Sequence, residues 1–553
     1  MKRFLSLLLA AMMLLSLVAC GGGTTSTPGS GEQSGTLPPP AVTPPSQGMA
    51  GEGTKPADPA PSTPADPTPS APAEVKYKDR IVIAHTTAID KHDPHADGTA
   101  TGYMAYKAVL GNLLDYFPET GEYRPDLAES WEVNGKVYTF HLRKGVTFHN
   151  GETFKASDVV FSINRMKEGT ATKAYVTDVV DVRAIDDYTV EIELSAPNAE
   201  FLVKLGLGNA CIVNEKAVTD DPEKGTMIGT GAYVWTEQVP QNYNLFTRNE
   251  NYWGELPPSK EIEFRFYAER AACSIALQTG EVDVQLEIAA ADAHHIAEDK
   301  NTTLIQKPTF KMVYLALNTN GVYPEYANQK VRQALNCATN REDIILAFRE
   351  GYAFAPNGMI PIGVWGYDEN VKAFNYDPEK AIALLAEEGY NASNPLKVQI
   401  CATSTFAPLF EILQAQWAAV GVELTLQTSD STTYSDLRNS KPDATHWAGI
   451  HQYNFTGTDS PLRTIWHSTG SSNHSKTFKP ELDAMLDAAV QEMDPDKRLE
   501  KYAELSQWLA DWCGWVPLYQ DILLIGQRAN VTGMYYGPAT DHDFTYAGVV
   551  LEG

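Results

Sequence analysis

The apolar positions of this chain recur in two periods, one typical of strands and the other of helices. The apolar run IVIA within residues 78–87 predicts a strand. Turn-forming pairs lie between alternating apolar and polar residues at Asn134-Gly135 and at Asp186-Asp187, which predicts two hairpins. Residues 410–427 are expected to form a helix that runs into a strand. Strands that alternate with helices in this way predict an α/β fold.

Two further helices are predicted from their start signals or from an apolar stripe. Asp377 is a predicted N-cap, Pro378 suits the first helical position and Gly389 lies near the expected C-cap. In residues 494–512 the apolar side chains recur at helical spacing. The members of that stripe are Leu499, Tyr502, Leu505, Leu509 and Trp512.

The first twenty residues have the pattern of a bacterial lipoprotein signal peptide. Lys2 and Arg3 precede an apolar run, which ends with small Ala19 directly before Cys20. In such a signal peptide Cys20 becomes the lipidated first residue of the mature protein. A retained transmembrane helix is the alternative, but the apolar run is shorter than the roughly 20 residues that span a bilayer. We therefore expect a lipid anchor at the outer face of the cytoplasmic membrane, which faces the periplasm if the host is a diderm.

Residues 21–74 are predicted to be a disordered linker. They consist mainly of Pro, Gly, Ser, Thr and Ala, so they cannot bury enough apolar area to offset the entropy of ordering. The remaining residues 75–553 are too many for one ordinary core and should form at least two lobes. The formal net charge of −27 argues against nucleic acid and anionic lipid surfaces as partners.

Several residue types that could carry chemistry lack the spacing that chemistry needs. The sequence has no HExxH, P-loop or GxSxG pattern, so we expect neither an enzyme nor a cofactor. His92 and His95 flank Pro94 and are expected in a polar loop rather than a metal site. Arg332 and Arg341 are expected to make structural ion pairs. Five cysteines after Cys20 form no CxxC pair and are expected mostly as small buried hydrophobes, with their pairing left open. They are Cys211, Cys273, Cys337, Cys401 and Cys513.

A long segment resembles one family of transport receptors. Residues 124–165, RPDLAESWEVNGKVYTFHLRKGVTFHNGETFKASDVVFSINR, are similar to the signature region of the peptide/nickel class of ABC-transporter solute-binding proteins, family 5. Later blocks match in the expected order, and the resemblance covers almost all of residues 80–530. These blocks are GTGAYVW, NENYWG, GEVDV, VRQALNCATNREDII, YDPEKAIALLAEEGY and FKPELDAMLDAAV.

The resemblance implies a two-lobe periplasmic-binding-protein-like α/β fold (class II, large cluster C type), with a hinge and an extra N-terminal subdomain. Lobe I is expected over 75–317, including the subdomain at about 111–227, lobe II over 318–523, and a C-terminal return to lobe I over 524–553. The chain should cross between the lobes near 314–320 and again near 517–526. The implied protein is a monomer that captures a solute between the lobes and delivers it to ABC permease subunits and, through them, an ATPase.

The resemblance also implies where the ligand binds. In dipeptide receptors of the family, the segment that matches 446–455 faces the cleft, and an aspartate there holds the peptide amino terminus; here the aligned position is Ile450. The arginine that pairs the peptide carboxylate would fall near Ser404, but no arginine occurs between Arg349 and Arg438. Because an unpaired buried ion costs several kcal/mol, a free dipeptide is a poor ligand.

Candidate contacts are therefore aromatic or neutral, with core packing as the alternative for Trp447, His451 and Tyr453. An oligopeptide is favoured by the family. The alternatives are an oligosaccharide or other neutral solute, a nickel complex held by His451, and a surface receptor or adhesin that is not coupled to transport. The predicted ligand-binding residues are Thr99, Ala100, Thr101, Trp365, Tyr367, Ser404, Trp447, Ile450, His451, Tyr453 and Phe455.

Overall fold

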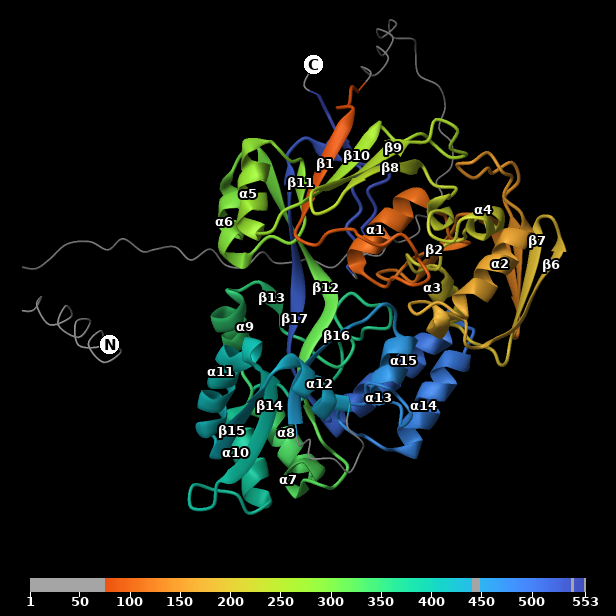
Figure 1. Ribbon diagram of the computed structural model, residues 1–553. Helices are drawn as coiled ribbons and strands as arrows, with labels where there is room; N and C mark the ends of the chain where they lie inside the picture. Colours follow the sequence, from red (N-terminus) through yellow and green to blue (C-terminus); the bar gives the residue numbers. More distant parts are fainter. Residues whose placement is uncertain (1–74, 440–447, 539–541, 552–553) are drawn as a thin grey trace, which may run out of the picture. The chain divides into compact units, whose positions relative to one another are not determined.

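The computed structural model describes residues 75–439, 448–538 and 542–551. Two long strands, β12 (Thr302–Leu317) and β17 (Trp515–Arg528), pair antiparallel over most of their length. Figure 1 shows them running from one group of strands and helices, lobe I, into a second group, lobe II. Each strand therefore contributes one half to each lobe, and together they form the connection between the lobes.

The lobe I part of the sheet continues outward from β17. Its strands follow in the order β11, β1, β10, β9 and β8, and β1 is parallel to both β10 and β11. Apolar side chains of β1 alternate between two buried clusters, one under α1 and one under α5 and α6, so both faces of the strand are covered. The bounds are β1 Arg80–His85, β8 Tyr233–Val239, β9 Tyr243–Arg248, β10 Glu261–Phe266, β11 Val284–Gln285, α1 Ala100–Val109, α5 Arg270–Thr279, α6 Ala290–Glu298, β18 Val531–Thr532 and β19 Gly548–Val549.

The lobe II part of the sheet continues outward from β12 in the order β16, β14 and β15. These three strands run parallel to one another and antiparallel to β12, and β13 pairs with β17. One of its faces packs on α8 to α11 and the other on α13 to α15. The bounds are β13 Ala353–Phe354, β14 Leu396–Thr403, β15 Val422–Ser429, β16 Ala448–Asn454, α7 Pro324–Ala327, α8 Gln329–Cys337, α9 Arg341–Arg349, α10 Pro378–Glu387, η3 Ser404–Phe406, α11 Ala407–Ala418, α12 Ser431–Asn439, α13 Asp459–Trp466, α14 Pro480–Gln491 and α15 Pro495–Trp512.

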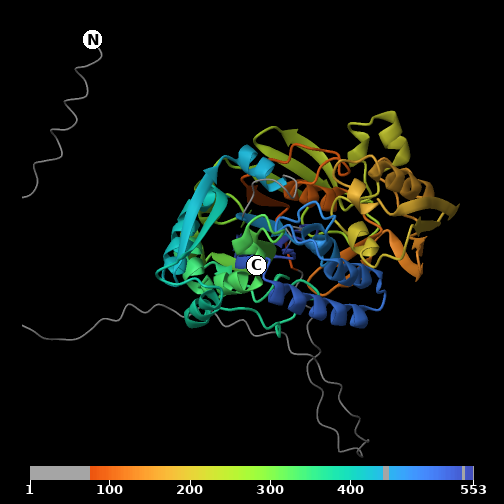
Figure 2. The ribbon, with the colours of Figure 1, turned by 90° about the horizontal axis from the view of Figure 1, so that it is seen from below.

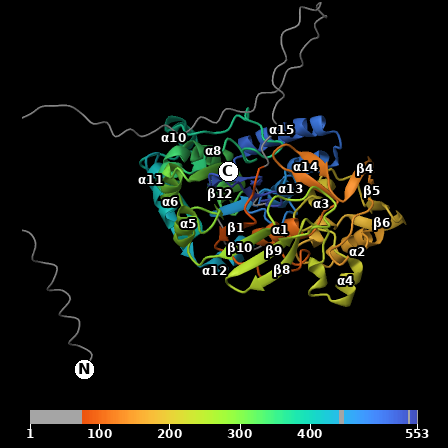
Figure 3. The same cartoon turned by 90° about the horizontal axis from the view of Figure 1, so that it is seen from above.

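The extra subdomain has its own sheet, in the order β4-β5-β7-β6, and its own apolar core, which spans Leu113 to Ile212. A backbone hydrogen bond of 3.0 Å from Ala199 N to Val490 O joins it to α14. Figures 1, 2 and 3 all show it beside the α13–α15 group of lobe II. The bounds are β2 Leu114–Phe117, β3 Glu122–Pro125, β4 Ala128–Asn134, β5 Val137–Leu142, β6 Val179–Asp186, β7 Thr189–Leu194, α2 Ala156–Met166, α3 Phe201–Leu205, α4 Glu215–Asp220, η1 Lys173–Tyr175 and η2 Gly225–Met227.

The crossing between the lobes is marked by a break in strand register. Pro308 pairs with Ile522, but the next paired residue of β12, Met312, lies opposite Gln520. Proline has no N–H to give to the ladder, which accounts for the break at this position. A second shift in register falls between Val313 and Tyr314, so the irregular part of β12 extends from Pro308 to Tyr314, opposite residues 517–522 of β17. The expected crossings near 314–320 and 517–526 stay predictions.

The local sequence signals were reliable guides to these elements. Both predicted hairpins are present, but Asn134 pairs with Val137 and Asp186 with Thr189, so the turns are residues 135–136 and 187–188, one residue later than predicted; Gly135 has a φ of 61°. The predicted helix-to-strand segment is α11 followed by β15. Asp377 caps α10 by accepting a 2.9 Å hydrogen bond from Lys380 N. The apolar stripe of α15 is buried from Tyr502 to Leu509, but Leu499 is 37 % exposed and lies outside it.

Two predictions about single residue types are corrected. Arg332 and Arg341 do not form ion pairs; they are buried and donate to backbone carbonyls, such as Trp512 O at 2.9 Å and Pro517 O at 2.8 Å. Burial lowers the pKa of each guanidinium to about 10. His95 does lie in a loop, but its ring is buried and Nε2 lies 2.9 Å from Cys211 O. Cys211, Cys273, Cys337, Cys401 and Cys513 are buried free thiols, as expected.

Candidate functional site

The carboxyl ends of the parallel strands of both lobes point toward the crossing. In lobe I, β11 runs antiparallel to β17 and β1 and β10 run with β11, so all three end on the side of the crossing. In lobe II, β16 runs antiparallel to β12, from Ala448 opposite Leu317 to Asn454 opposite Lys311, and β14 and β15 run with it. Ligands of open α/β sheets bind outside the carboxyl ends of strands. The two facing edges are therefore the candidate functional site.

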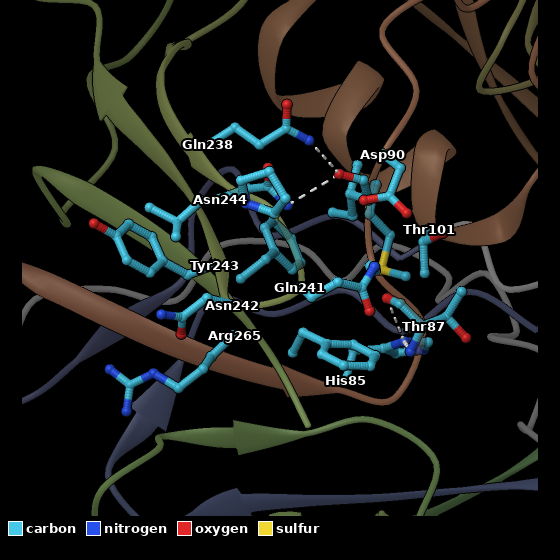
Figure 4. A pocket seen from close by; sticks show the side chains of 17 residues that line it. His85, Thr87, Asp90, Thr101, Gln238, Gln241, Asn242, Tyr243, Asn244 and Arg265 are labelled. Atoms are coloured by element: carbon cyan, nitrogen blue, oxygen red, sulfur yellow. Dashed lines mark hydrogen bonds between the residues drawn. The ribbon is translucent and has the colours of Figure 1, made fainter. Parts of the chain in front are cut away.

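The lobe I edge carries a small pocket whose polar lining is mostly neutral, with Asp90 and Arg265 as charged members (Figure 4). It lies at the ends of β1 and β10, where the β8–β9 turn and the loop after β1 meet. His85 closes its floor, and the ring Nδ1 accepts a 2.8 Å hydrogen bond from Thr87 N. Burial lowers the pKa of His85, which keeps the imidazole neutral at physiological pH. Of the residues predicted from sequence, Thr101 lines this pocket.

Carboxamide side chains dominate the wall of this pocket. Gln238 Nε2 and Asn244 Nδ2 both donate to Ile89 O, at 2.9 and 3.2 Å, and so fix the loop after β1 (Figure 4). Asn244 Oδ1 is buried without a hydrogen-bond partner. Gln241 and Asn242 at the turn are exposed, and Gln241 has a φ of 57°. This edge offers amide donors and acceptors, together with the carboxylate of Asp90 and the guanidinium of Arg265. Sequence reasoning missed it, although the string QVPQNYN was a visible signal.

The lobe II edge is also polar where it is exposed. Ser404, predicted from sequence, is exposed directly after β14, and Gln452 and Asn454 are exposed on β16. These groups can donate to and accept from a ligand backbone. Thr403 pairs with Ser429, so β15 ends at the same edge.

The ring of His451 is part of a buried cluster of rings. It is 3 % exposed, stacks on His474 with 4.2 Å between ring centroids, and lies 5.8 Å from the ring of Tyr314. The hydroxyl of Tyr434 lies 3.2 Å from His451 Nδ1. Within residues 75–439, 448–538 and 542–551, no group of three or more His, Cys, Asp or Glu side chains could hold a metal ion.

The other candidates on β16 differ in how much surface they leave for a ligand. Ile450 is 1 % exposed and packs in the cluster under α8 to α11, and Phe455 is fully buried against α13 and α15. Tyr453 is half-buried, with its ring 5.7 Å from that of Phe455. Burial raises the pKa of Tyr453. Among the described residues of this segment, Tyr453 therefore keeps the accessible aromatic surface.

Trp365 joins lobe II to the extra subdomain. Its backbone N–H donates to Pro118 O at 3.1 Å. Its ring meets that of Tyr502 edge-on, with 5.7 Å between the ring centroids, and Arg498 Cζ lies 4.7 Å from the Trp365 ring centroid. A Cβ on Gly121 would lie only 2.8 Å from Trp365 Cδ1. Tyr367 is a partly buried neighbour of the same apolar cluster.

The predicted residues at the start of α1 have different roles: Thr99 caps the helix, and Thr101 lines the lobe I pocket. The Thr99 side chain accepts from Gly102 N at 3.2 Å and donates to Asp97 Oδ2 at 2.7 Å, so it caps the helix. Ala100 is half-buried at the first helical position. Trp447 and Cys20, also predicted as functional residues, lie outside the described residues.

Two carboxylates near the joints between lobes were not predicted. Asp521, at the crossing of β17, is paired with Lys311 Nζ at 3.0 Å and Arg349 Nη2 at 2.8 Å. Glu200 of the subdomain accepts a 2.8 Å hydrogen bond from Asp459 N of α13. Residues 200 and 459 are far apart in the chain, so no local pattern could have paired them.

This fold defines a class, the two-lobe solute-binding proteins. The structure of HbpA2 from Haemophilus parasuis matches with a TM-score of 0.79 and 25 % identity over 85 % of this chain and all of that one. The pattern of the bacterial extracellular solute-binding proteins, family 5, matches residues 122–473. The chain belongs to this family.

Curated relatives extend the match over most of the chain. The dipeptide-binding protein of Escherichia coli K12 is 30 % identical over 82 % of this chain and 91 % of its own length. Heme-binding protein A of Haemophilus influenzae is 28 % identical over 82 % of this chain and 89 % of its own. Among the described residues, no helix has both the length and the apolar character to cross a bilayer.

Proposed function

We propose that this protein captures a peptide between its lobes and delivers it to an ABC importer. The observation that carries the proposal is the convergence of six strand ends from two lobes at one crossing, in a chain that belongs to the family 5 solute-binding proteins. Ligand contacts from both lobes favour a closed form, so binding shifts an open–closed equilibrium. No catalytic step is proposed.

Peptide as the ligand class is supported by relatives and by the chemistry of the two edges. The most similar curated proteins include the dipeptide-binding protein of E. coli, which does not favour the oligosaccharide alternative. The exposed groups Gln241, Asn242, Ser404 and Asn454 are neutral donors and acceptors that suit a peptide backbone. Tyr453 adds an aromatic face for a side chain.

A peptide longer than two residues fits these edges better than a free dipeptide does. The exposed groups Gln241, Asn242, Ser404 and Asn454 are neutral, and a carboxylate introduced at position 450 would enter the apolar core. Asp90 is an exposed carboxylate at the lobe I pocket. We propose that the neutral groups hold the backbone along its length and that the terminal charges contribute little.

The binding test uses calorimetry and small-angle scattering with defined peptides. We expect pentaalanine to bind and to reduce the radius of gyration, and we expect its acetylated, amidated form to bind within about threefold, because the termini are not paired. Maltopentaose serves as the neutral non-peptide control. Binding of maltopentaose without binding of any peptide, or an unchanged radius at saturating peptide, would overturn the proposal.

A lipid anchor at Cys20 is the second part of the proposal, and it rests on the signal-peptide pattern. Cys20→Ser should release the protein from membranes into the medium or soluble fraction, whereas Thr25→Ala, in the neighbouring linker, should leave it membrane-bound. A Cys20→Ser protein that remains in the membrane fraction would show that the anchor is different. With the lipid anchor at Cys20, we propose that the protein acts as a monomer tethered to the membrane near its permease.

A further inference from the structure

The contact between the extra subdomain and lobe II contains two buried carboxyl groups from different parts of the chain. Glu200 directly precedes α3 of the subdomain, Asp459 is the first residue of α13, and they are 6 % and 1 % exposed. The Asp459 N–H donates to Glu200 Oε1 at 2.8 Å, and among the described residues Asp459 Oδ1 is buried without a hydrogen-bond partner. The two acidic groups thus meet at one contact, beside a cavity that both of them line.

Two of the three cations near this pair have another partner. Arg463 Nη1 binds Asp487 Oδ1 at 2.5 Å, and Arg498 Nη1 donates to Glu492 O at 3.3 Å. Burial and the negative charge of Glu200 raise the pKa of Asp459 well above its usual range, against the opposing pull of the nearby cations. The charged and titratable groups that face the pair are Lys204 on α3, Arg463 on α13, Asp487 on α14, Arg498 and Tyr502 on α15, Tyr116 and Tyr123 on β2 and β3, and Asp178 in the adjoining cavity.

The same contact includes two further junctions between the subdomain and lobe II. Ala199 N donates to Val490 O at 3.0 Å, and Trp365 N donates to Pro118 O at 3.1 Å. Gly457 packs against Val203 and Glu200, with space for no more than a Cβ. Movement of lobe II away from the subdomain would therefore expose both carboxyl groups to water at once.

We infer that Asp459 carries a proton beside Glu200 while the subdomain contacts lobe II, so that proton uptake stabilises the closed form. The inference rests on the proposed function for the opening and closing of the lobes. In the open form Asp459 is solvated and can ionise away from the charge of Glu200. A protonated Asp459 also removes the charge from the oxygen that lacks a partner, which lowers the cost of burying it.

The direction of the pH effect follows from this difference. The closed form binds the proton more tightly than the open form, so closure is favoured at low pH. It weakens as the pH rises through the raised pKa of Asp459 in the closed form. Because one proton is involved, the closed-to-open ratio can change by at most about tenfold per pH unit. Acidic surroundings would thus favour capture, and a rise in pH would favour release.

The test measures closure without any ligand. Spin labels on Ser130→Cys of β4 and Ala484→Cys of α14, both exposed positions, report the distance between subdomain and lobe II in the full chain in detergent. The other described cysteines are buried. We expect the short-distance population to fall between pH 5 and pH 8.5. A population that does not change over this range would overturn the inference.

Three variants assign the effect to the pair. Asp459→Asn removes the group that takes up the proton and Glu200→Gln removes the charge beside it, so both should flatten the pH dependence, whereas Glu481→Gln, at an exposed position of α14, should keep the wild-type slope. A wild-type slope in both Asp459→Asn and Glu200→Gln would overturn the inference. Circular dichroism checks folding, and if one of these two variants does not fold, the other carries the test alone.

Peptide calorimetry on the same samples separates this inference from the proposed function. If the label distance follows pH but pentaalanine does not bind, the proton-linked contact stands and the peptide proposal fails. If pentaalanine binds and closes the lobes but the distance does not change with pH, the peptide proposal stands and the proton on Asp459 is refuted.

Discussion

Lobe II is joined to the rest of the fold in two places, and the acid at each place has neighbours of opposite charge. At the crossing strands, partly buried Asp521 is held between two cations, Lys311 and Arg349, at 3.0 and 2.8 Å. At the subdomain contact, fully buried Asp459 lies against a second carboxyl group, that of Glu200. The crossing is built to stay formed, whereas the contact is only conditionally stable.

This difference matches what each joint must do in a receptor that opens and closes. A hinge keeps its covalent and ionic connections in both states, so neutralised charge there costs nothing during movement. A contact that must separate when the lobes open can carry a small free-energy cost in the closed form, provided that binding of ligand or protons offsets that cost. Partial instability of the subdomain contact is therefore useful rather than a defect.

The largest expected effect is at the crossing. Asp521→Ala leaves Lys311 and Arg349 facing each other without their carboxylate and should lower the free energy of unfolding by about 1–3 kcal/mol. Asp487→Ala is the control, because its ion pair with Arg463 is half-exposed and should be worth less than about 1 kcal/mol. Urea denaturation measures both, and equal losses would contradict the special role of the crossing.

Next is the packing of Trp365 on the subdomain. Gly121→Ala and Gly135→Ala both place a side chain at positive φ, 69° and 61°, and should each cost about 1 kcal/mol of stability. Only at 121 would the new Cβ meet Trp365; nothing lies within 4 Å of it at 135. Gly121→Ala should therefore also reduce the closed population seen by the spin labels. An equal closed population in both variants would rule out Trp365 as a closure contact.

The third prediction concerns how the thermal stability of the protein depends on pH through Asp459 at the subdomain contact. Since the pKa of Asp459 is raised in the folded protein, its ionisation weakens the fold as the pH rises through that raised value. Asp459→Asn should therefore melt higher than wild type at pH 8, and the gap should close toward pH 4. The gap can grow by at most about 1.4 kcal/mol per pH unit. A gap of constant size at every pH would mean that the side chain, not its charge, is responsible.

The smallest effect concerns the candidate ligand surface. Tyr453→Ala should weaken pentaalanine binding by about 0.5–1.5 kcal/mol, because it removes an accessible ring. His451→Ala should mainly lower the melting temperature, since that ring is 3 % exposed and stacked on His474. Calorimetry and thermal melts on both variants decide. If Tyr453→Ala lost stability and bound peptide normally, this part of β16 would be core only.

The local architecture was predictable from sequence because its causes are local. Gly135 favours a hairpin turn because it adopts positive φ, and Asp377 with Pro378 favours a helix start; both effects depend only on neighbouring residues. The family resemblance then supplied the two-lobe arrangement. Arg332 was misjudged as one partner of an ion pair, because a sequence does not show that backbone carbonyls of a distant helix end would surround it.

The site was less predictable because it depends on burial and on distant pairings. The strand β16 lies between two helical layers, so Ile450 and His451 are both buried although they point to opposite faces. Alternation along the strand could not reveal this. Glu200 and Asp459 meet only after the subdomain packs on lobe II, and neither residue stands out in its own segment.

The central claim is that the lobes enclose a peptide, and the most direct test is to identify what the protein carries. The full chain is purified under gentle conditions and denatured, and the released compounds are analysed by mass spectrometry. The account predicts a set of peptides longer than two residues, in amounts comparable to the protein. Release of an oligosaccharide, a nickel complex or another non-peptide compound in such amounts would contradict it.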